Sequence, residues 1–113
     1  MYMAPDFPNF VKNLPEARLP MGGATVRHLA TPQGQIAFIE THDRVDFPEH
    51  SHGNQWGIVV DGSLRLNVEG MTTTISRGDS YFIPAGKPHQ VTLAPGTRAI
   101  DIFDDPRRYE AKA

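Results

Sequence analysis

Short apolar runs alternate with turn signals along most of this chain. The runs are rich in Val, Ile, Thr and aromatic residues, and each ends at a turn containing Gly or Pro, which is typical of short β-strands. The strands predicted in this way cover residues 24–30, 35–41, 56–60, 63–68, 72–76, 80–83, 89–93 and 98–103. Asp61-Gly62 is the strongest hairpin signal, because a tight two-residue turn needs positive backbone angles that these residues tolerate. About eight antiparallel strands indicate an all-β sandwich or barrel.

The two ends of the chain have a different pattern. Prolines forbid a long helix in the first twenty residues, although Phe7, Phe10, Val11 and Leu14 have the spacing of one short amphipathic turn. We expect an arm that packs against the barrel or against a partner subunit, and a loosely ordered tail is the alternative. The last residues are polar, and we expect their charges to be solvated. The predicted organisation is an N-terminal arm (1–20), a β-barrel (21–105) and a polar C-terminal tail (106–113).

Composition and charge narrow the class of protein. The 113 residues fit one domain, and 39% hydrophobic with 21% charged residues is a globular balance. A net charge of −2 with scattered Lys and Arg argues against a nucleic-acid partner. The chain shows neither a signal-peptide pattern nor the roughly 20 consecutive apolar residues of a membrane span. We therefore expect a soluble, cytoplasmic protein without a membrane partner.

Three histidines are the first sign of chemistry. His50 and His52 are one residue apart, so in a strand their imidazoles would share one face and form half of a metal site. Such pairs also occur on solvated strand edges. A third histidine, His89, stands at the start of a later predicted strand. Because the chain has no cysteine, any metal must be held by nitrogen and oxygen atoms.

Two motifs around these histidines resemble those of the cupin superfamily. The second cupin motif is matched by Gly78, Pro84, Gly86 and His89 at the family's spacing, and the first by His50-Ser51-His52 followed by Gly62. The resemblance covers roughly residues 24–104. It implies a small antiparallel jelly-roll β-barrel of the RmlC-like type.

The resemblance also implies one divalent metal ion inside the barrel. Carried over residue by residue, its ligands become His50, His52, Gln55 and His89. Nitrogen and oxygen ligands suit Fe, Ni, Mn, Cu or Zn, and the sequence does not choose among them.

The chain departs from the family pattern at three positions. Arg44 stands where the first motif opens with glycine, and Leu93 stands where the second motif often closes with asparagine. Gln55 replaces the acidic ligand and lies only three residues after His52, so the intervening turn is shorter. A glutamine ligand occurs in some relatives, including cupins that act on unsaturated uronic sugars. The alternative is that Gln55 hydrogen-bonds a water or a histidine.

Three further residues are candidates for the pocket. Tyr81 and Phe82 alternate on one strand, so one is expected to line the pocket and the other the opposite face, with ordinary core packing as the alternative. Asp101 lies between two isoleucines, where a carboxylate could orient a metal-bound histidine or accept a proton. The favoured interpretation of Asp101 is an acid that faces outward from its strand.

The predicted function follows from the charge of this ligand set. Three neutral imidazoles and a neutral amide leave a divalent metal uncompensated, so the site should attract a small polar or anionic substrate. We expect an enzyme that inserts dioxygen, or that isomerises or tautomerises a sugar acid or keto acid, with an unassigned general base. The alternatives are a non-catalytic ligand-binding or regulatory module and a purely structural cupin. Small jelly rolls of this family commonly pair, so we also expect a homodimer, with the apolar arm offering a contact surface.

Overall fold

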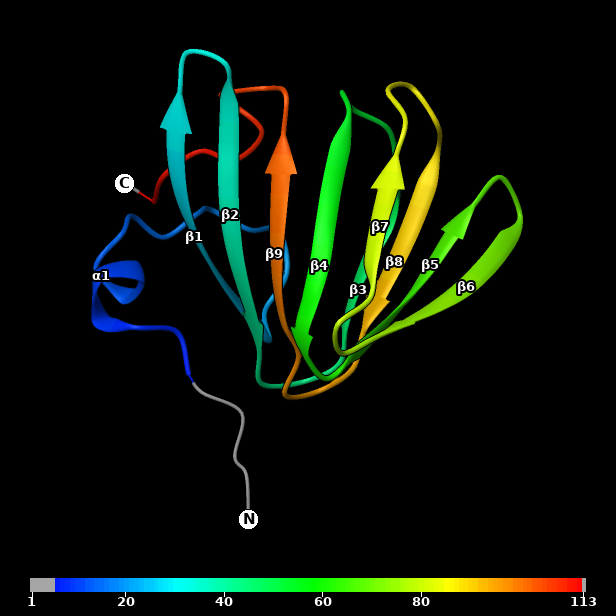
Figure 1. Ribbon diagram of the computed structural model, residues 1–113, viewed down its shortest axis with the longest axis horizontal. Coiled ribbons are helices and arrows are strands. Elements are labelled where there is room, and N and C mark those ends of the chain that lie inside the picture. The colour runs from blue at the N-terminus through cyan, green and yellow to red at the C-terminus, as the bar shows by residue number, and fades with distance from the viewer. Residues whose placement is uncertain (1–5, 113) are drawn as a thin grey trace.

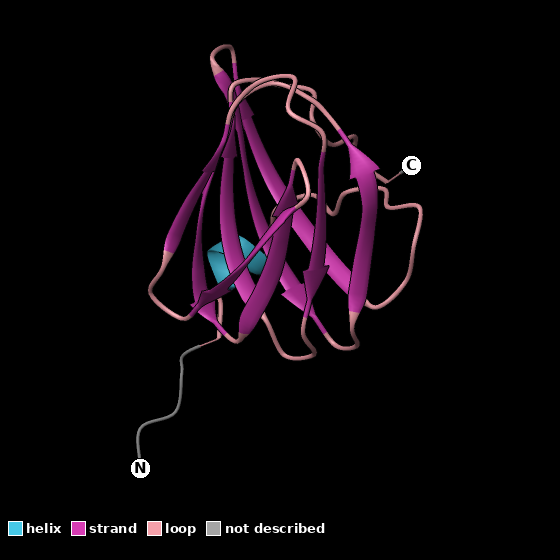
Figure 2. Ribbon diagram, turned by 90° about the vertical axis from the view of Figure 1, so that its right-hand side faces the viewer, coloured by secondary structure: helices cyan, strands magenta, loops and turns pink. Residues whose placement is uncertain are grey.

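The computed structural model describes residues 6–112, which form two antiparallel sheets that face each other (Figures 1 and 2). The five-stranded sheet has the order β1-β2-β9-β4-β7 and the four-stranded sheet the order β3-β8-β5-β6. The elements are α1 (Asn9–Lys12), β1 (Ala24–Thr31), β2 (Gly34–Thr41), β3 (Val45–His50), β4 (Gln55–Asp61), β5 (Ser63–Val68), β6 (Met71–Ser76), β7 (Ser80–Ile83), β8 (His89–Leu93) and β9 (Arg98–Phe103). The predicted all-β jelly roll is confirmed.

The core lies between the two sheets. In β2 and β9 every second residue is buried, as expected when one face of a sheet meets a core and the other does not. Ile39 and Val59 from the five-stranded sheet join Leu64 and Leu93 from the other sheet in one buried cluster. This inward face is also the one that carries the candidate site.

One strand, β3, is absent from the strands predicted by the pattern. Its sequence VDFPEH contains three polar residues and Pro48, which cannot donate a ladder hydrogen bond. β3 nevertheless pairs with β8, and the register shifts between Phe47 and His50. This bulge accommodates the proline and ends the strand on a histidine.

The arm is an ordered part of the fold from Asp6 onward. Val11 of α1 is buried, and the Phe7 ring meets the ring of Phe38 edge-on at 5.7 Å between centroids. Further along, the Ala17 N–H donates to the Val26 carbonyl of β1 at 2.7 Å. The alternative of a loosely ordered tail is therefore wrong for the described part of the arm. Residues 1–5 lie outside the described residues.

The C-terminal segment is not the solvated tail that its composition predicts. The Arg18 N–H donates to the Glu110 carbonyl at 2.7 Å, and the Lys112 N–H donates to the Glu16 carbonyl at 2.9 Å. Tyr109 is buried in the core cluster. The arm and the tail thus pair with each other beside β1, and the tail brings side chains to the interior.

Within the described residues, no helix has the length and apolar character needed to cross a bilayer.

Candidate metal centre

Three imidazoles from separate parts of the chain converge at one end of the space between the sheets. His50 ends β3, His89 begins β8, and the ring centroids of this pair are 4.3 Å apart. His52 lies 4.7 Å from His89 and 5.2 Å from His50 by the same measure. One nitrogen of each ring lies within 4.8 Å of the others. His52 follows the end of β3, so the loop, rather than a shared strand face, brings it beside His50.

Backbone pairing fixes this convergence. His50 and His89 are register partners between β3 and β8. The loop that carries His52 is tied to the neighbouring loop, because the Gly86 N–H donates to the His52 carbonyl at 2.9 Å. At Gly53 an added Cβ would lie 2.2 Å from an Asp104 carboxylate oxygen. Because glycine has no Cβ, the backbone at Gly53 can pass this close to Asp104, which allows the short turn before β4.

The tautomers of the three histidines favour metal binding. Each Nδ1 lies beside a backbone carbonyl: His50 at 2.7 Å from Pro48, His52 at 2.8 Å from Gly53, and His89 at 2.9 Å from Lys87. Nδ1–H therefore donates to the carbonyl and leaves the Nε2 lone pair free, which is the usual arrangement of metal-bound imidazoles.

The electrostatics of the triad agree with that arrangement. Nε2 of His52 is buried without a hydrogen-bond partner among the described residues. Burial lowers the pKa of His50 and lowers that of His52 to about 4, so both imidazoles stay neutral near pH 7. The unpartnered Nε2 of His52, close to a nitrogen of His50 and of His89, is poor packing but a good fit to a divalent cation.

Gln55 begins β4 and is buried in the cavity that His50 and His89 also line. Its side chain hydrogen-bonds the Asp101 carboxyl. The sequence interpretation offered a metal, a water or a histidine as its partner. The structure adds a fourth partner, a carboxyl group from the neighbouring strand β9.

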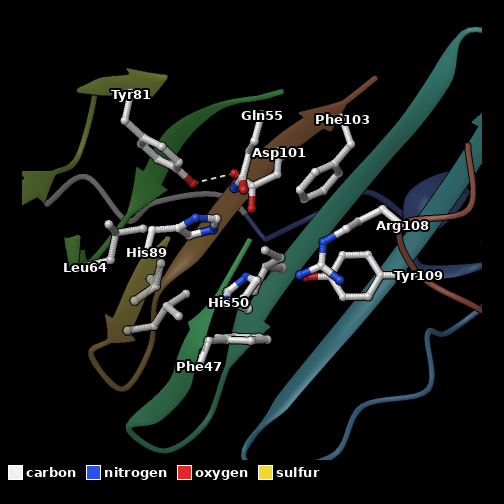
Figure 3. Close-up of a pocket in the computed structure, with 13 residues that line it drawn as sticks. Phe47, His50, Gln55, Leu64, Tyr81, His89, Asp101, Phe103, Arg108 and Tyr109 are labelled. Carbon is white, nitrogen blue, oxygen red and sulfur yellow. Dashed lines mark hydrogen bonds between the residues drawn. The ribbon is translucent and has the colours of Figure 1, made fainter. Parts of the chain in front are cut away.

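Asp101 is the clearest correction to the sequence analysis. It was expected to face outward, but it is only 4% exposed, and the Tyr81 hydroxyl donates to it (Figure 3). Burial raises the pKa of Asp101 to about 6 against the opposing effect of its hydrogen bonds. Gly57 leaves the space that this pair occupies, because glycine has no Cβ. An added Cβ at Gly57 would lie 2.2 Å from Asp101 Oδ1 and 2.3 Å from Tyr81 Cζ. A glycine inside a predicted strand is the sequence signal for such an approach.

Tyr81 and Phe82 point in opposite directions, as their alternation predicts. Tyr81 is buried and lines the cavity, whereas Phe82 is exposed on the far face of the sheet. Phe82 therefore does not line the cavity that holds His50 and His89.

The C-terminal segment supplies residues that the sequence analysis assigned to solvent. The Arg108 guanidinium carbon lies 4.4 Å from the centre of the Tyr109 ring and 5.3 Å from that of Phe103. Its Nε is buried without a hydrogen-bond partner in the described chain. Figure 3 shows Arg108 and Tyr109 on the opposite side of the cavity from Tyr81 and His89.

The side chain of Gln35 in β2 holds this segment in place. Its Oε1 accepts the Tyr109 N–H at 3.0 Å, and its Nε2 donates to the carbonyls of Tyr109 at 3.0 Å and Pro106 at 3.2 Å. Pro106 and Tyr109 lie 71 and 74 residues after Gln35 in the sequence, so no local pattern could predict these hydrogen bonds.

The cavity has a narrow inner part and a wider outer part. The inner volume of about 30 Å³ lies among His50, Gln55, His89 and Asp101 and has room for one or two water-sized groups. The outer volume of about 380 Å³ is bounded by the arm and the tail and shares His50 and Arg108 with the inner part. A small molecule could thus place one end beside the triad and the remainder beside Arg108.

Comparisons with known proteins agree with this architecture. The family model described as "Cupin domain" matches residues 39–103. KdgF from Halomonas sp. is 26% identical, with a TM-score of 0.71 over 81% of this chain and 86% of that one. An RmlC-like cupin from Shewanella frigidimarina NCIMB 400 is 26% identical, with a TM-score of 0.72 over 83% of this chain and 86% of that one.

A more distant structure shares the fold alone. Oxalate decarboxylase from Bacillus subtilis, which contains Mn(II) centres, is 17% identical, with a TM-score of 0.73 over 86% of this chain but only 29% of that one. No curated protein matches the sequence significantly.

Proposed function

Because this chain belongs to the cupin family, we propose that it is a metal-dependent enzyme that moves a proton on a small anionic substrate, as an isomerase or tautomerase of a sugar acid or keto acid. The observation that carries this proposal is the buried Asp101 carboxyl, which lines the same cavity as His50 and His89. A carboxyl with its pKa raised to about 6 can both accept and release a proton near neutral pH.

In this proposal the metal is held by His50, His52 and His89, with Gln55 as the fourth ligand. The free Nε2 of His52 and the neutral imidazoles of His50 and His52 fit such an ion, and the choice among Fe, Ni, Mn, Cu and Zn is left to elemental analysis. When bound, a divalent cation supplies the charge that attracts and polarises an anionic group. Gln55 would then connect the ligand set to Asp101 through its hydrogen bond to that carboxyl.

The other side chains have complementary tasks. Tyr81 holds the Asp101 carboxyl in place through its hydroxyl. Arg108 presents a cation at the boundary of the inner and outer volumes, where it would pair with a substrate carboxylate. Phe103 and Tyr109 flank the guanidinium and keep that end of the inner cavity apolar.

Proton transfer is preferred over dioxygen insertion for two reasons. Dioxygen insertion does not call for a buried proton carrier, whereas Asp101 occupies such a position. The resemblance to cupins with a glutamine ligand that act on unsaturated uronic sugars supports the same choice.

The test combines elemental analysis with turnover. Protein purified without chelators or nickel resin is expected to contain about one metal ion per chain and to convert at least one member of a panel of unsaturated uronates and keto acids. His89→Ala should lose both properties. The isosteric Asp101→Asn should keep the metal and lose about 10²- to 10⁴-fold in kcat.

Three outcomes would contradict the proposal. They are no metal even after supplementation, full activity in Asp101→Asn, and saturable binding of the panel without turnover. The last outcome would select the non-catalytic binding module.

A further inference from the structure

The outer volume of the cavity is lined mainly by apolar side chains. We call five of these residues the apolar wall: Leu19, Pro20, Met21, Phe47 and Pro48. Leu19, Met21 and Phe47 are half-buried. Because proline has no backbone N–H, Pro20 and Pro48 also lack the main-chain donor that other residues would present. Among the described residues that line this volume, none is Asn, Gln, Asp, Ser or Thr. The apolar wall therefore offers apolar contact and few hydrogen bonds.

The charged residues that line the outer volume differ in their surroundings. Arg18 and Glu110 lie 3.9 Å apart, and their side chains are 63% and 71% exposed, so they pair with each other in solvent. Arg108 instead lines both the outer and the inner volume. Its Nε is buried and has no hydrogen-bond partner among the described residues. Arg108 is therefore the cation that the negative group of a bound molecule would meet.

The apolar wall is held in place by the fold. The Arg18 N–H donates to the Glu110 carbonyl at 2.7 Å, which fixes the segment that carries Leu19 beside the C-terminal segment. Leu19 and Phe47 both pack against the buried core cluster. Phe47 also lines the inner volume, so the apolar lining is continuous from one volume to the other. A ligand would find this surface already formed.

We infer that the substrate of this site is a small 2-oxo acid with an apolar side chain, rather than a polyhydroxylated sugar acid. This inference rests on the function proposed above and chooses between the substrate classes named there. The oxo and carboxylate groups lie toward Arg108 and the histidines, and the side chain lies against the apolar wall. The outer volume of about 380 Å³ is near the lower end of the range of roughly 300–1,000 Å³ for small-molecule sites. It suits a branched aliphatic group or a single aromatic ring.

The difference in binding comes from the hydroxyl groups. A sugar acid would place several hydroxyls against the apolar wall, and each hydroxyl that leaves water without a new partner loses its hydrogen bonds. An apolar chain has no such loss, and each methylene that it buries strengthens binding about fourfold. The same wall thus favours one class of acid and rejects the other.

Such an acid supports the proposed reaction without a further reactant. The C3–H bond breaks and its electron pair forms a double bond between C2 and C3. The 2-oxo oxygen keeps the electron pair of the former carbonyl double bond and receives a proton. The keto acid becomes its enol, and no atom or electron is gained or lost.

Three acids that share the 2-oxo carboxylate group test the inference by isothermal titration calorimetry of the metal-containing protein. Pyruvate has this group alone, 4-methyl-2-oxopentanoate adds a branched apolar chain, and 3-deoxy-2-oxogluconate has as many carbon atoms but carries hydroxyls. We expect 4-methyl-2-oxopentanoate to bind roughly 10- to 60-fold more tightly than pyruvate, at about fourfold for each added carbon that is buried. 3-Deoxy-2-oxogluconate should bind no more tightly than pyruvate.

Three variants locate the two ends of the bound acid. Met21→Gln puts an amide into the apolar wall and should weaken 4-methyl-2-oxopentanoate by about threefold or more while pyruvate keeps its affinity. Met71→Gln makes the same change on β6, where the side chain is 77% exposed, and should alter neither acid. Arg108→Met removes the charge but keeps an aliphatic chain, so it should weaken both acids by the same factor, roughly tenfold or more.

The inference is overturned if 3-deoxy-2-oxogluconate or pyruvate binds as tightly as 4-methyl-2-oxopentanoate, or if Arg108→Met binds 4-methyl-2-oxopentanoate like wild type. Should Met21→Gln fail to fold, the comparison of the three acids on the wild-type protein decides. Exchange of the C3 hydrogens for deuterium, followed by NMR in D₂O, separates this inference from the proposed function. Tight binding of the apolar acid without exchange supports the ligand class and refutes the enzyme. Exchange of the sugar acid alone supports the enzyme and overturns the ligand class.

Discussion

Replacing Gln35 with leucine removes the side chain that ties the C-terminal segment to the core. The substitution places an apolar residue of similar size at this buried position and deletes the three hydrogen bonds that Gln35 makes to the C-terminal segment, two to Tyr109 and one to Pro106. The backbone groups left behind must then either stay unpaired or move to water. Because Arg108 lies between these two partners, its position at the cavity depends on them.

The structure gives the size of the effect. Three hydrogen bonds at roughly 0.5–1.5 kcal/mol each set a loss of about 1.5–4.5 kcal/mol if the segment stays in place. Release of the segment costs the burial of the Tyr109 side chain, roughly 1.5–3 kcal/mol. Of these two states, segment in place or segment released, the variant adopts the one with the lower free energy. We therefore expect Gln35→Leu to lower the free energy of unfolding by about 2–3 kcal/mol.

Urea denaturation and amide hydrogen exchange measure the two parts of this prediction. Exchange of the peptide covering residues 106–112 should accelerate in Gln35→Leu, while metal content stays unchanged because the histidines belong to other segments. Gln33→Leu, at an exposed position in the same hairpin, is the matched control and should change stability by less than about 0.5 kcal/mol. Unchanged exchange of residues 106–112 would refute the idea that Gln35 holds this segment.

Three further predictions concern the cavity. Gly57→Ala places a Cβ against Asp101 and Tyr81, so urea denaturation should show a loss of about 1–3 kcal/mol, whereas Gly22→Ala, which meets nothing within 4 Å, should be neutral. In chelator-treated protein, the stability of wild type relative to Asp101→Asn should fall as pH rises from about 4 to about 6 and stay level above. The Asp101 carboxyl has a pKa of about 6 in the folded protein and about 3.8 in the unfolded chain. This difference in pKa corresponds to a loss of roughly 3 kcal/mol in the free energy of unfolding across that pH range. A stability difference between wild type and Asp101→Asn that does not change with pH would contradict a buried Asp101 acid. Saturating the triad with a metal at 100 times its Kd should stabilise the fold by about 2.7 kcal/mol in thermal melts, and equal stabilisation of His50→Ala would argue against these ligands.

Much of the architecture was predictable from local pattern. Alternation of apolar and polar residues, together with glycine and proline turns, indicated eight of the strands because side-chain direction in a strand repeats every two residues. The histidines could be grouped in advance because His50, His52 and His89 stand in two motifs that resemble those of a known family. β3 escaped detection because Pro48 and its polar neighbours disturb the alternation on which the prediction rests.

Only the tertiary structure decided the surroundings of the histidines. A carboxylate between two isoleucines has the pattern of an outward-facing residue, and Asp101 points inward because Tyr81 and Gln55 from other strands meet it there. Arg108 belongs to a polar stretch, and it reaches the cavity because Gln35 captures the backbone on either side of it. Local periodicity ordinarily determines which face of a strand is buried. The hydrogen-bonding partners that stabilise a buried polar group such as Asp101 lie far along the chain, so only the tertiary structure brings them together.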